Sequence, residues 1–133
     1  MQDKIASEIM TSPVISAKKE AWVRDIANQF VEKKYSGMPV TESDGSVIGI
    51  VTEIDILRAA NEGHELAIAK AQDVMTKNVA TIGPDTPMTK MIKIMGDFHI
   101  IRLPVVRAGK LIGIVSRIDI IRNMVEPNFM SNM

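Results

Sequence analysis

The chain has 133 residues, 46% of them hydrophobic and 24% charged, with 16 acidic and 16 basic side chains that give a net charge of zero. This balance predicts no general attraction to nucleic acid or acidic lipid, and the absence of cysteine excludes disulfides, thiolate nucleophiles and cysteine-bound metals. Because no apolar run reaches the roughly 18 residues of a membrane helix and the N-terminus lacks a signal-peptide layout, we expect a cytoplasmic protein that holds no metal and binds neither membrane nor nucleic acid.

The predicted secondary structure runs through the chain in the same order twice. Apolar periodicity and turn signals predict strand, helix, strand, strand and helix, first at residues 14–16, 22–31, 38–40, 47–51 and 54–60. The second series lies at residues 79–81, 88–95, 103–106, 111–115 and 118–124. Thr86 and Pro87 suit the start of a helix as N-cap and first helical residue. Between the two series, residues 64–72 are predicted to form a joining helix.

The two halves are copies of one sequence pattern. Met10-Thr11 recurs as Met75-Thr76, and the stretch GIVTEIDILR from Gly49 recurs as GIVSRIDIIR from Gly113. A half of this size would bury too little surface to be stable alone. We therefore expect repeats at 1–64 and 65–133 that pack sheet to sheet, with pseudo-twofold symmetry, into one compact α+β module.

These motifs point to a family. MTSPVIS and MTKNVAT begin the repeats, YSGMPV and IIRLPV lie in their middle, and GIVTEID and GIVSRID lie near their ends. The same three motifs in the same order, twice, resemble the cystathionine-β-synthase (CBS) domain pair, also called the Bateman module, over nearly the whole chain. The resemblance implies a β-α-β-β-α fold for each repeat.

The resemblance also implies a function. CBS pairs sense adenosine-containing ligands such as AMP, ADP, ATP or S-adenosylmethionine, regulate an attached or partner protein, and commonly form twofold homodimers through their helices. No phosphate-binding loop, histidine–carboxylate constellation or cysteine nucleophile indicates an enzyme. We therefore expect a stand-alone regulatory module whose partner the sequence does not identify. The alternative is a structural dimerisation module without a ligand.

The repeated phrase allows two interpretations. Thr52 and Asp55, and likewise Ser116 and Asp119, have the spacing of a helix capping box, in which hydroxyl and carboxylate satisfy backbone NH groups. A helix N-terminus also suits phosphate, and an ionised Asp can accept hydrogen bonds from both hydroxyls of a ribose. The resemblance favours the second interpretation, since the family's Asp holds the ribose and its Ser or Thr lies beside ribose or phosphate.

Further residues of the two sites also follow from the resemblance. In similar proteins, the adenine is held by the first strand and by the segment before the proline, here Tyr35 to Pro39 and Ile100 to Pro104. A simpler interpretation of Pro39 and Pro104 is that they begin edge strands, where a missing NH costs nothing. The candidate residues of the first site are Ser16, Tyr35, Gly37, Met38, Pro39, Thr52 and Asp55. Those of the second site are Thr81, Ile101, Arg102, Pro104, Ser116, Arg117 and Asp119.

The two sites are not predicted to be equal. Arg102 and Arg117 stand in the second repeat where the first has Gly37 and Glu53. A guanidinium group presents a planar fork that suits phosphate, whereas a glutamate repels it. We therefore expect the site of Asp119 to prefer phosphorylated ligands.

Overall fold

Two compact units make up the chain. The computed structural model describes the backbone from residue 3 to residue 131 and the side chains as far as residue 125. One unit consists of residues 15–79, and the other, which we call the discontinuous unit, combines the residues before 15 with those from 80 onward. The first segment of each sequence repeat therefore packs with the sheet of the other repeat. The packing units thus differ from the predicted sequence repeats 1–64 and 65–133.

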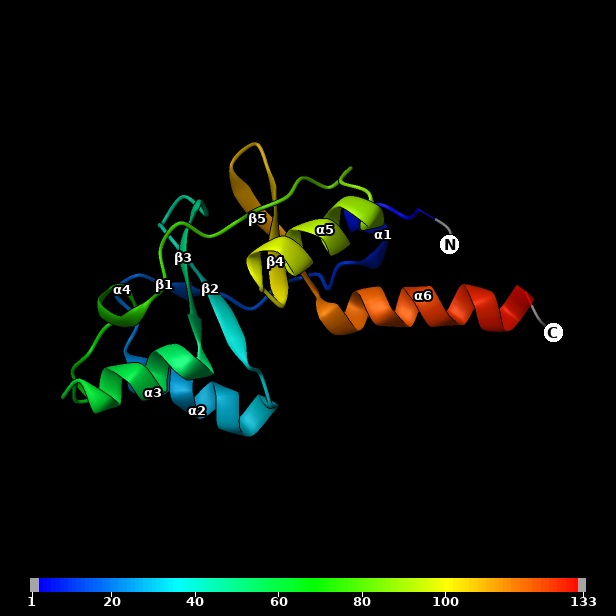
Figure 1. Cartoon of the computed structure of the whole chain (residues 1–133). Helices are drawn as coiled ribbons and strands as arrows, with labels where there is room; N and C mark the ends of the chain where they lie inside the picture. The colour runs from blue at the N-terminus through cyan, green and yellow to red at the C-terminus, as the bar shows by residue number, and fades with distance from the viewer. Residues whose placement is uncertain (1–2, 132–133) are drawn as a thin grey trace. The chain divides into compact units, whose positions relative to one another are not determined.

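The 15–79 unit is built on a three-stranded sheet (Figure 1). Strand β1 (Ala17–Lys18) is parallel to β2 (Gly37–Thr41), and β2 is antiparallel to β3 (Val47–Thr52). Two longer helices lie side by side and a short one completes the unit: α2 (Val23–Lys33), α3 (Glu53–Asn61) and α4 (Ala71–Val74).

The core of the 15–79 unit joins one helix face to one sheet face. Helix α2 buries Ile26 and Phe30, which lie one turn apart on the same stripe of the helix. These side chains pack with Met38, Val40 and Val51 of the two long strands. Burying a side chain of this kind contributes about 1.5–3 kcal/mol. The apolar periodicity therefore explains both the helix and the way it docks.

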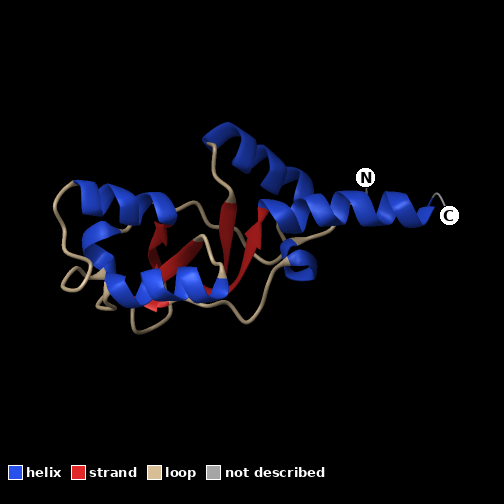
Figure 2. Ribbon diagram, turned by 90° about the horizontal axis from the view of Figure 1, so that it is seen from below, coloured by secondary structure: helices blue, strands red, loops and turns tan. Residues whose placement is uncertain are grey.

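The discontinuous unit repeats this plan (Figure 2). Strand β4 (Arg102–Arg107) is antiparallel to β5 (Lys110–Ser116). A single parallel bridge between Ile82 and Val105 takes the place of a first strand. The helices of the unit are α1 (Ala6–Ile9), α5 (Met88–Phe98) and α6 (Arg117–Ser131). Its core includes Met88, Met91, Leu103, Val105 and Val115.

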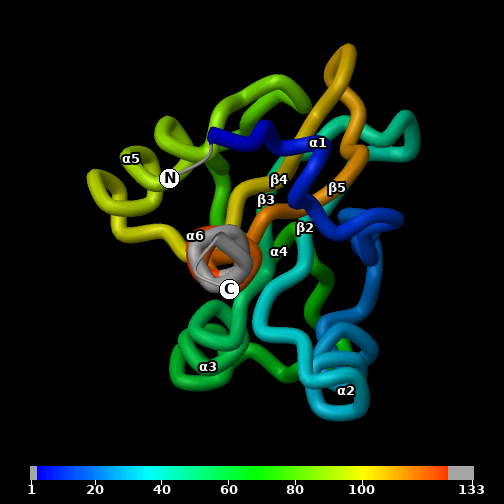
Figure 3. Tube along the Cα trace, turned by 90° about the vertical axis from the view of Figure 1, so that its right-hand side faces the viewer, coloured from blue at the N-terminus to red at the C-terminus, as the bar shows by residue number. Residues whose placement is uncertain are grey.

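The repeated Met-Thr and Gly-Ile-Val motifs pair with each other. In the 15–79 unit, the NH and carbonyl of Thr76 exchange hydrogen bonds of 2.8 and 3.0 Å with Ile50. In the discontinuous unit, Thr11 and Ile114 form the same pair at 2.9 and 3.1 Å. Figure 3 shows the start of the chain reaching α1, which contacts β5 and α6. Each motif therefore recurs because its partner motif recurs.

The first strand of each repeat differs from the prediction. Residues 14–16 and 79–81 were expected to be extended strands, but the paired residues come directly afterwards, at β1 and at Ile82. A residue belongs to a β-strand only where it pairs with a neighbouring strand, and β2 and β4 pair only with these later residues.

Two helix predictions are also wrong. Residues 64–72 do not form one helix: the chain turns at 66–68, and only α4 at the end of this stretch is helical. Gly63, with a left-handed φ of 93°, ends the preceding helical stretch. At the start of α5 the N-cap is Pro87 rather than Thr86, because the Thr86 hydroxyl instead accepts a hydrogen bond from the Gly83 NH at 3.1 Å.

Candidate functional site

The candidate residues of the 15–79 unit meet at one end of its sheet. Gly37 begins β2 and pairs with Thr52, which ends β3. Ser16 directly precedes β1, which runs in the same direction as β2. The strand directions therefore bring these three residues to the same end. In the discontinuous unit, Arg102 begins β4 and pairs with Ser116, which ends β5.

Both copies of the repeated phrase form the predicted capping box. The Thr52 hydroxyl accepts a hydrogen bond from the Asp55 NH at 3.3 Å, and the Asp55 carboxylate accepts one from the Thr52 NH at 2.8 Å. Ser116 and Asp119 form the same two bonds at 3.3 and 2.8 Å. Such a cap stabilises a helix by about 1 kcal/mol. The capping interpretation is therefore confirmed for both repeats.

Asp55 is a buried carboxylate with a full set of donors. Only 1% of its side chain is exposed. Its Oδ2 accepts from the Thr52 NH at 2.8 Å and from the Thr52 hydroxyl at 2.9 Å, and its Oδ1 accepts from the Arg58 guanidinium at 3.0 Å and the Thr76 hydroxyl at 2.8 Å. Since a carboxylate offers about four lone-pair positions, these donors satisfy Asp55 completely.

Asp119 has the same surroundings with one donor fewer. Its side chain is 10% exposed. Its Oδ2 accepts from the Ser116 NH at 2.8 Å and from the Ser116 hydroxyl at 3.0 Å, and its Oδ1 accepts from the Arg122 guanidinium at 3.2 Å. Within the described side chains, no second donor reaches Oδ1. One acceptor position of this carboxylate therefore has no donor among the described side chains.

Basic side chains distinguish the second site from the first. Arg102 at the start of β4 is half-buried, and Arg117, the first residue of α6, is exposed. The 15–79 unit has Gly37 and Glu53 at these positions. The helix dipole favours an acidic residue in the first turn and disfavours a basic one. Glu53 therefore stabilises its helix through the dipole, whereas Arg117 does not.

Several other candidate residues lie at these sheet ends with buried side chains. Met38, Pro39 and Pro104 are buried, and Tyr35 packs against the core of the 15–79 unit. The Pro104 carbonyl accepts a hydrogen bond from the Ile82 NH at 3.0 Å. These residues position the site chiefly through their backbones and through packing.

Three candidate residues are exposed beside the strands. Ser16 and Thr81 precede the first paired residues of their units, and Ile101 precedes β4. The Ile101 carbonyl accepts a hydrogen bond from the Arg117 NH at 3.0 Å. This bond ties the start of α6 to the start of β4.

The edge-strand interpretation is wrong for Pro39. Strand β2 is the middle strand of its sheet, between β1 and β3. The pairing with β1 begins only at Val40. The missing NH of Pro39 therefore breaks no rung of the ladder between β1 and β2.

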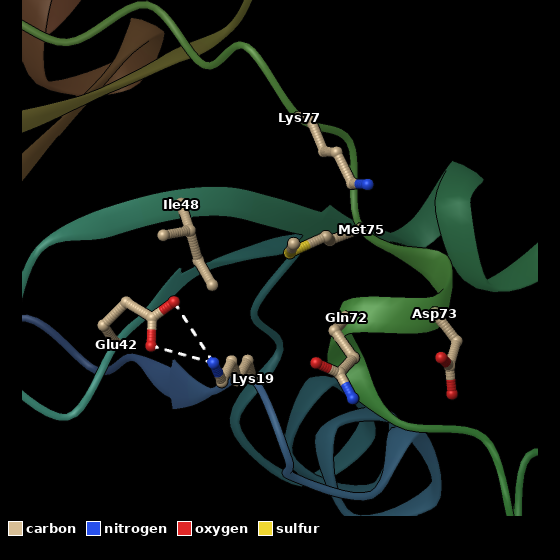
Figure 4. Close-up of a pocket in the computed structure, with 7 residues that line it drawn as sticks. All are labelled: Lys19, Glu42, Ile48, Gln72, Asp73, Met75 and Lys77. Carbon is tan, nitrogen blue, oxygen red and sulfur yellow. Dashed lines mark hydrogen bonds and ion pairs between the residues drawn. The ribbon is translucent and has the colours of Figure 1, made fainter.

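A separate hollow lies at the opposite end of the same sheet (Figure 4). It has a volume of about 500 Å³ and is lined by Lys19, Glu42, Ile48, Gln72, Asp73, Met75 and Lys77. The Lys19 Nζ lies 3.1 Å from the Glu42 Oε2, and this hydrogen-bonded pair raises the pKa of Lys19 above its ordinary value. Two acidic and two basic side chains line the hollow, so its lining favours neither sign of charge.

Three residues in the hydrogen-bond networks of Asp55 and Asp119 were not predicted from the sequence. Arg58 and Arg122 are the last residues of the two repeated phrases, and each lies three residues beyond its aspartate on the same helix face. That spacing alone could have predicted an ion pair between each arginine and its aspartate. Thr76 belongs to the repeated Met-Thr motif, but its contact with Asp55 joins distant parts of the chain, which no local pattern predicts.

Among residues 3–125, no three histidine, cysteine, aspartate or glutamate side chains gather as metal ligands would. None of the described helices has the length and apolar character needed to cross a membrane.

The sequence is similar to a known protein family and to individual proteins of other organisms. A family model of the CBS domain matches residues 6–62 and 71–126. The homoserine O-acetyltransferase of Methanococcoides burtonii is 33% identical over 117 residues, which are 87% of this chain but only 23% of that protein. An uncharacterised 17.7 kDa protein of Acidianus ambivalens is 32% identical over 126 residues, 93% of this chain and 75% of that protein.

Solved structures show the same fold. CBSX2 in complex with AMP matches with a TM-score of 0.83 and 27% identity, over 93% of this chain and 98% of that chain. The CBS domain pair of protein MJ0100, in complex with 5′-methylthioadenosine and S-adenosyl-L-methionine, matches with a TM-score of 0.83 and 25% identity, over 92% and 97% of the two chains.

Proposed function

The chain belongs to the CBS domain family, and from this we propose that it is a regulatory module that binds an adenosine-containing ligand and modulates a partner protein. The ligand classes are AMP, ADP, ATP and S-adenosylmethionine. Two similar CBS pairs hold AMP, or methylthioadenosine and S-adenosylmethionine. We assign the chain no catalytic activity of its own, because the match to the acetyltransferase covers only 23% of that enzyme.

The observation that carries this proposal is the Asp119 carboxylate. It is nine-tenths buried, it lies where a strand passes into a helix, and one of its acceptor positions has no donor from the described side chains. A ribose diol supplies hydroxyl donors to such an acceptor. In this proposal, Asp119 and Ser116 hold the ribose, while Thr81, Ile101 and the backbone around Pro104 flank the adenine.

The arginines of the second site support a phosphorylated ligand there. Arg117 has no acidic partner among the described side chains and opposes the dipole of its own helix. A bound phosphate would reverse that penalty, and Arg102 at the start of the neighbouring strand would add a second cation. The other proposed ligand site, the first, lies in the 15–79 unit and comprises Ser16, Tyr35, Gly37, Met38, Pro39, Thr52 and Asp55.

A thermal-shift panel tests the proposed function. AMP, ADP, ATP, NADH and S-adenosylmethionine are each added to the folded protein, because a ligand that binds only the native state raises Tm. We expect at least one of them to raise Tm by several degrees at saturation. If none does, the proposed ligand function is wrong and the structural dimerisation alternative is favoured.

One observation favours self-association of the chain, in addition to the proposed ligand binding. Helices α3 and α6 expose large apolar side chains, including Ile54 and Leu57 on α3 and Ile118 and Ile121 on α6. Apolar surface of this kind is typical of helix faces that associate. We therefore propose that the chain forms a homodimer through these helices.

A further inference from the structure

We infer that the hydroxyl of Thr76 closes the site of Asp55, so that the two sites of this chain differ in affinity for the ribose of an adenosine ligand. This inference rests on the proposed function and identifies a residue that sets which site is filled. It is carried by the difference between two otherwise matched hydrogen-bond networks.

The two networks are equivalent in their backbone. Thr76 pairs with Ile50, two residues before Thr52, and Thr11 pairs with Ile114, two residues before Ser116. The four hydrogen bonds of these pairs lie between 2.8 and 3.1 Å. Both threonines are therefore held at the same place relative to their aspartates.

Their hydroxyls behave differently. The Thr76 Oγ1 donates to the Asp55 Oδ1 at 2.8 Å, whereas the Thr11 hydroxyl makes no hydrogen bond to Asp119 among the described side chains. The remaining donors match closely, since Arg58 and Arg122 bind their aspartates at 3.0 and 3.2 Å with 54% and 53% of their side chains exposed. Among the side chains described as far as residue 125, Thr76 is thus the one donor that Asp55 has and Asp119 lacks.

The Thr76 hydroxyl occupies the acceptor position that a ribose hydroxyl needs. With four donors on a carboxylate of about four lone-pair positions, Asp55 can accept from a ribose only after a protein donor leaves. The donors from Thr52 and Arg58 have counterparts at Asp119, in Ser116 and Arg122, so Thr76 is the donor in which the two sites differ. At Asp119, no donor has to leave. A ligand therefore fills the Asp119 site first and the Asp55 site only at higher concentration.

Isothermal titration with adenosine tests this inference, since a ligand without phosphate removes the effect of the arginines. The proteins are the wild type, Thr76→Val, which keeps the side-chain shape without the hydroxyl, and the matched control Thr11→Val. We expect one tight site per chain in the wild type and in Thr11→Val. Thr76→Val should gain a second site, about tenfold or more tighter than the Asp55 site of the wild type. Changes in the NMR chemical shifts of the backbone amides of residues 52–58 on adding adenosine would locate the gained site at Asp55.

A measurement without ligand checks the bond itself. Loss of a hydrogen bond to a buried carboxylate should lower the Tm of Thr76→Val by about 3–8 °C, while Thr11→Val should melt close to the wild type. Equal melting of the two variants would overturn the inference.

The titration separates this inference from the proposed function. If the wild type binds adenosine at one site and Thr76→Val binds it identically, the inference is wrong and the proposed function stands. If the wild type fills two equal sites, the inference is also wrong. If neither adenosine nor any nucleotide binds the wild type or the variants, both are wrong.

Discussion

The two aspartates of the repeated phrase show how helix capping can hold a carboxylate in a fixed place. Asp55 and Asp119 each accept a hydrogen bond from the first NH of their capping box. This role fixes the carboxylate at the strand-to-helix junction. The second oxygen of each carboxylate faces an arginine on the next turn. Ligand binding would therefore add to a carboxylate that folding has already oriented.

The glycine that begins the repeated phrase is explained by a close approach. A Cβ on Gly49 would lie 2.9 Å from the Thr76 carbonyl oxygen and closer still to the Met75 sulfur. We therefore predict that Gly49→Ala lowers the free energy of unfolding by about 1–3 kcal/mol, the usual cost of overpacking. Urea denaturation monitored by circular dichroism measures this change.

Gly96 provides the control for this prediction. It lies in the interior of α5, and a Cβ there would meet no atom within 4 Å. Gly96→Ala should raise the free energy of unfolding by about 0.5–1 kcal/mol, because alanine favours a helix more than glycine does. Equal stability of Gly49→Ala and the wild type would contradict the account of the Met-Thr contact.

At the scale of single residues, the local chemistry of the site was predictable and its long-range contact was not. Thr52 and Asp55 form the capping box that their spacing predicts. The ribose role of Asp55 and Asp119 stays a prediction. The bond from Thr76 depends on which strand the second Met-Thr motif pairs with, and that pairing follows from the tertiary structure.

At the scale of elements, the two hairpins follow from turn residues and strand pattern. The loop of the second hairpin is shorter than that of the first, and its turn has two residues with positive φ, Ala108 at 50° and Gly109 at 79°. Two-residue hairpin turns require this conformation, which glycine and asparagine adopt more readily than alanine. Ala108 is therefore a strained residue in an otherwise suitable turn.

Relief of this strain gives a prediction for the turn. Ala108→Asn creates the Asn-Gly pair that such turns prefer, and we expect the free energy of unfolding to rise by about 0.5–1 kcal/mol. The urea midpoint of this variant measures the gain. Gly109→Ala should shift the midpoint in the opposite direction. A lower midpoint for Ala108→Asn would contradict the assigned turn geometry.

The elements that were mispredicted lie where tertiary contacts override local preference. Residues 64–72 are rich in helix formers, yet the chain there turns so that Ala69 is buried and Lys70 pairs with Trp22. The first strands are displaced because only β2 and β4 determine which residues find a partner. Long, strongly periodic helices such as α2 and α5 were predicted correctly in type and near their observed bounds.

At the scale of the whole molecule, the exchange of first segments explains why the chain needs both repeats. Residues before 15 belong to the unit formed by residues from 80 onward, where Thr11 pairs with Ile114. In the same way, Thr76 of the second repeat pairs with Ile50 in the 15–79 unit. Neither sequence repeat contains all of its own core. The composition and repeats predicted a tandem α+β fold, but they could not show this exchange, because equivalent motifs fit either partner.

Self-association of the whole chain is testable through α3. Leu57 is 66% exposed on this helix, and we expect Leu57→Glu to shift the mass of the particle from that of a dimer toward that of a single chain. Sedimentation equilibrium of the wild type and the variant measures this change. Lys93→Glu serves as the control, because Lys93 is an exposed charge on α5, which is not one of the two helices proposed to associate. A wild type that sediments as a single chain would contradict the proposed homodimer.

Titration calorimetry of AMP is the most direct test of the central claim, that Asp119 holds an adenosine ligand. The wild type is compared with Asp119→Ala and with Asp55→Ala, which loses the equivalent capping box, after each protein is shown by circular dichroism to be folded. We expect saturable binding by the wild type, similar binding by Asp55→Ala, and binding at least about tenfold weaker by Asp119→Ala. No binding by the wild type, or equal affinity of the wild type and Asp119→Ala, would contradict it.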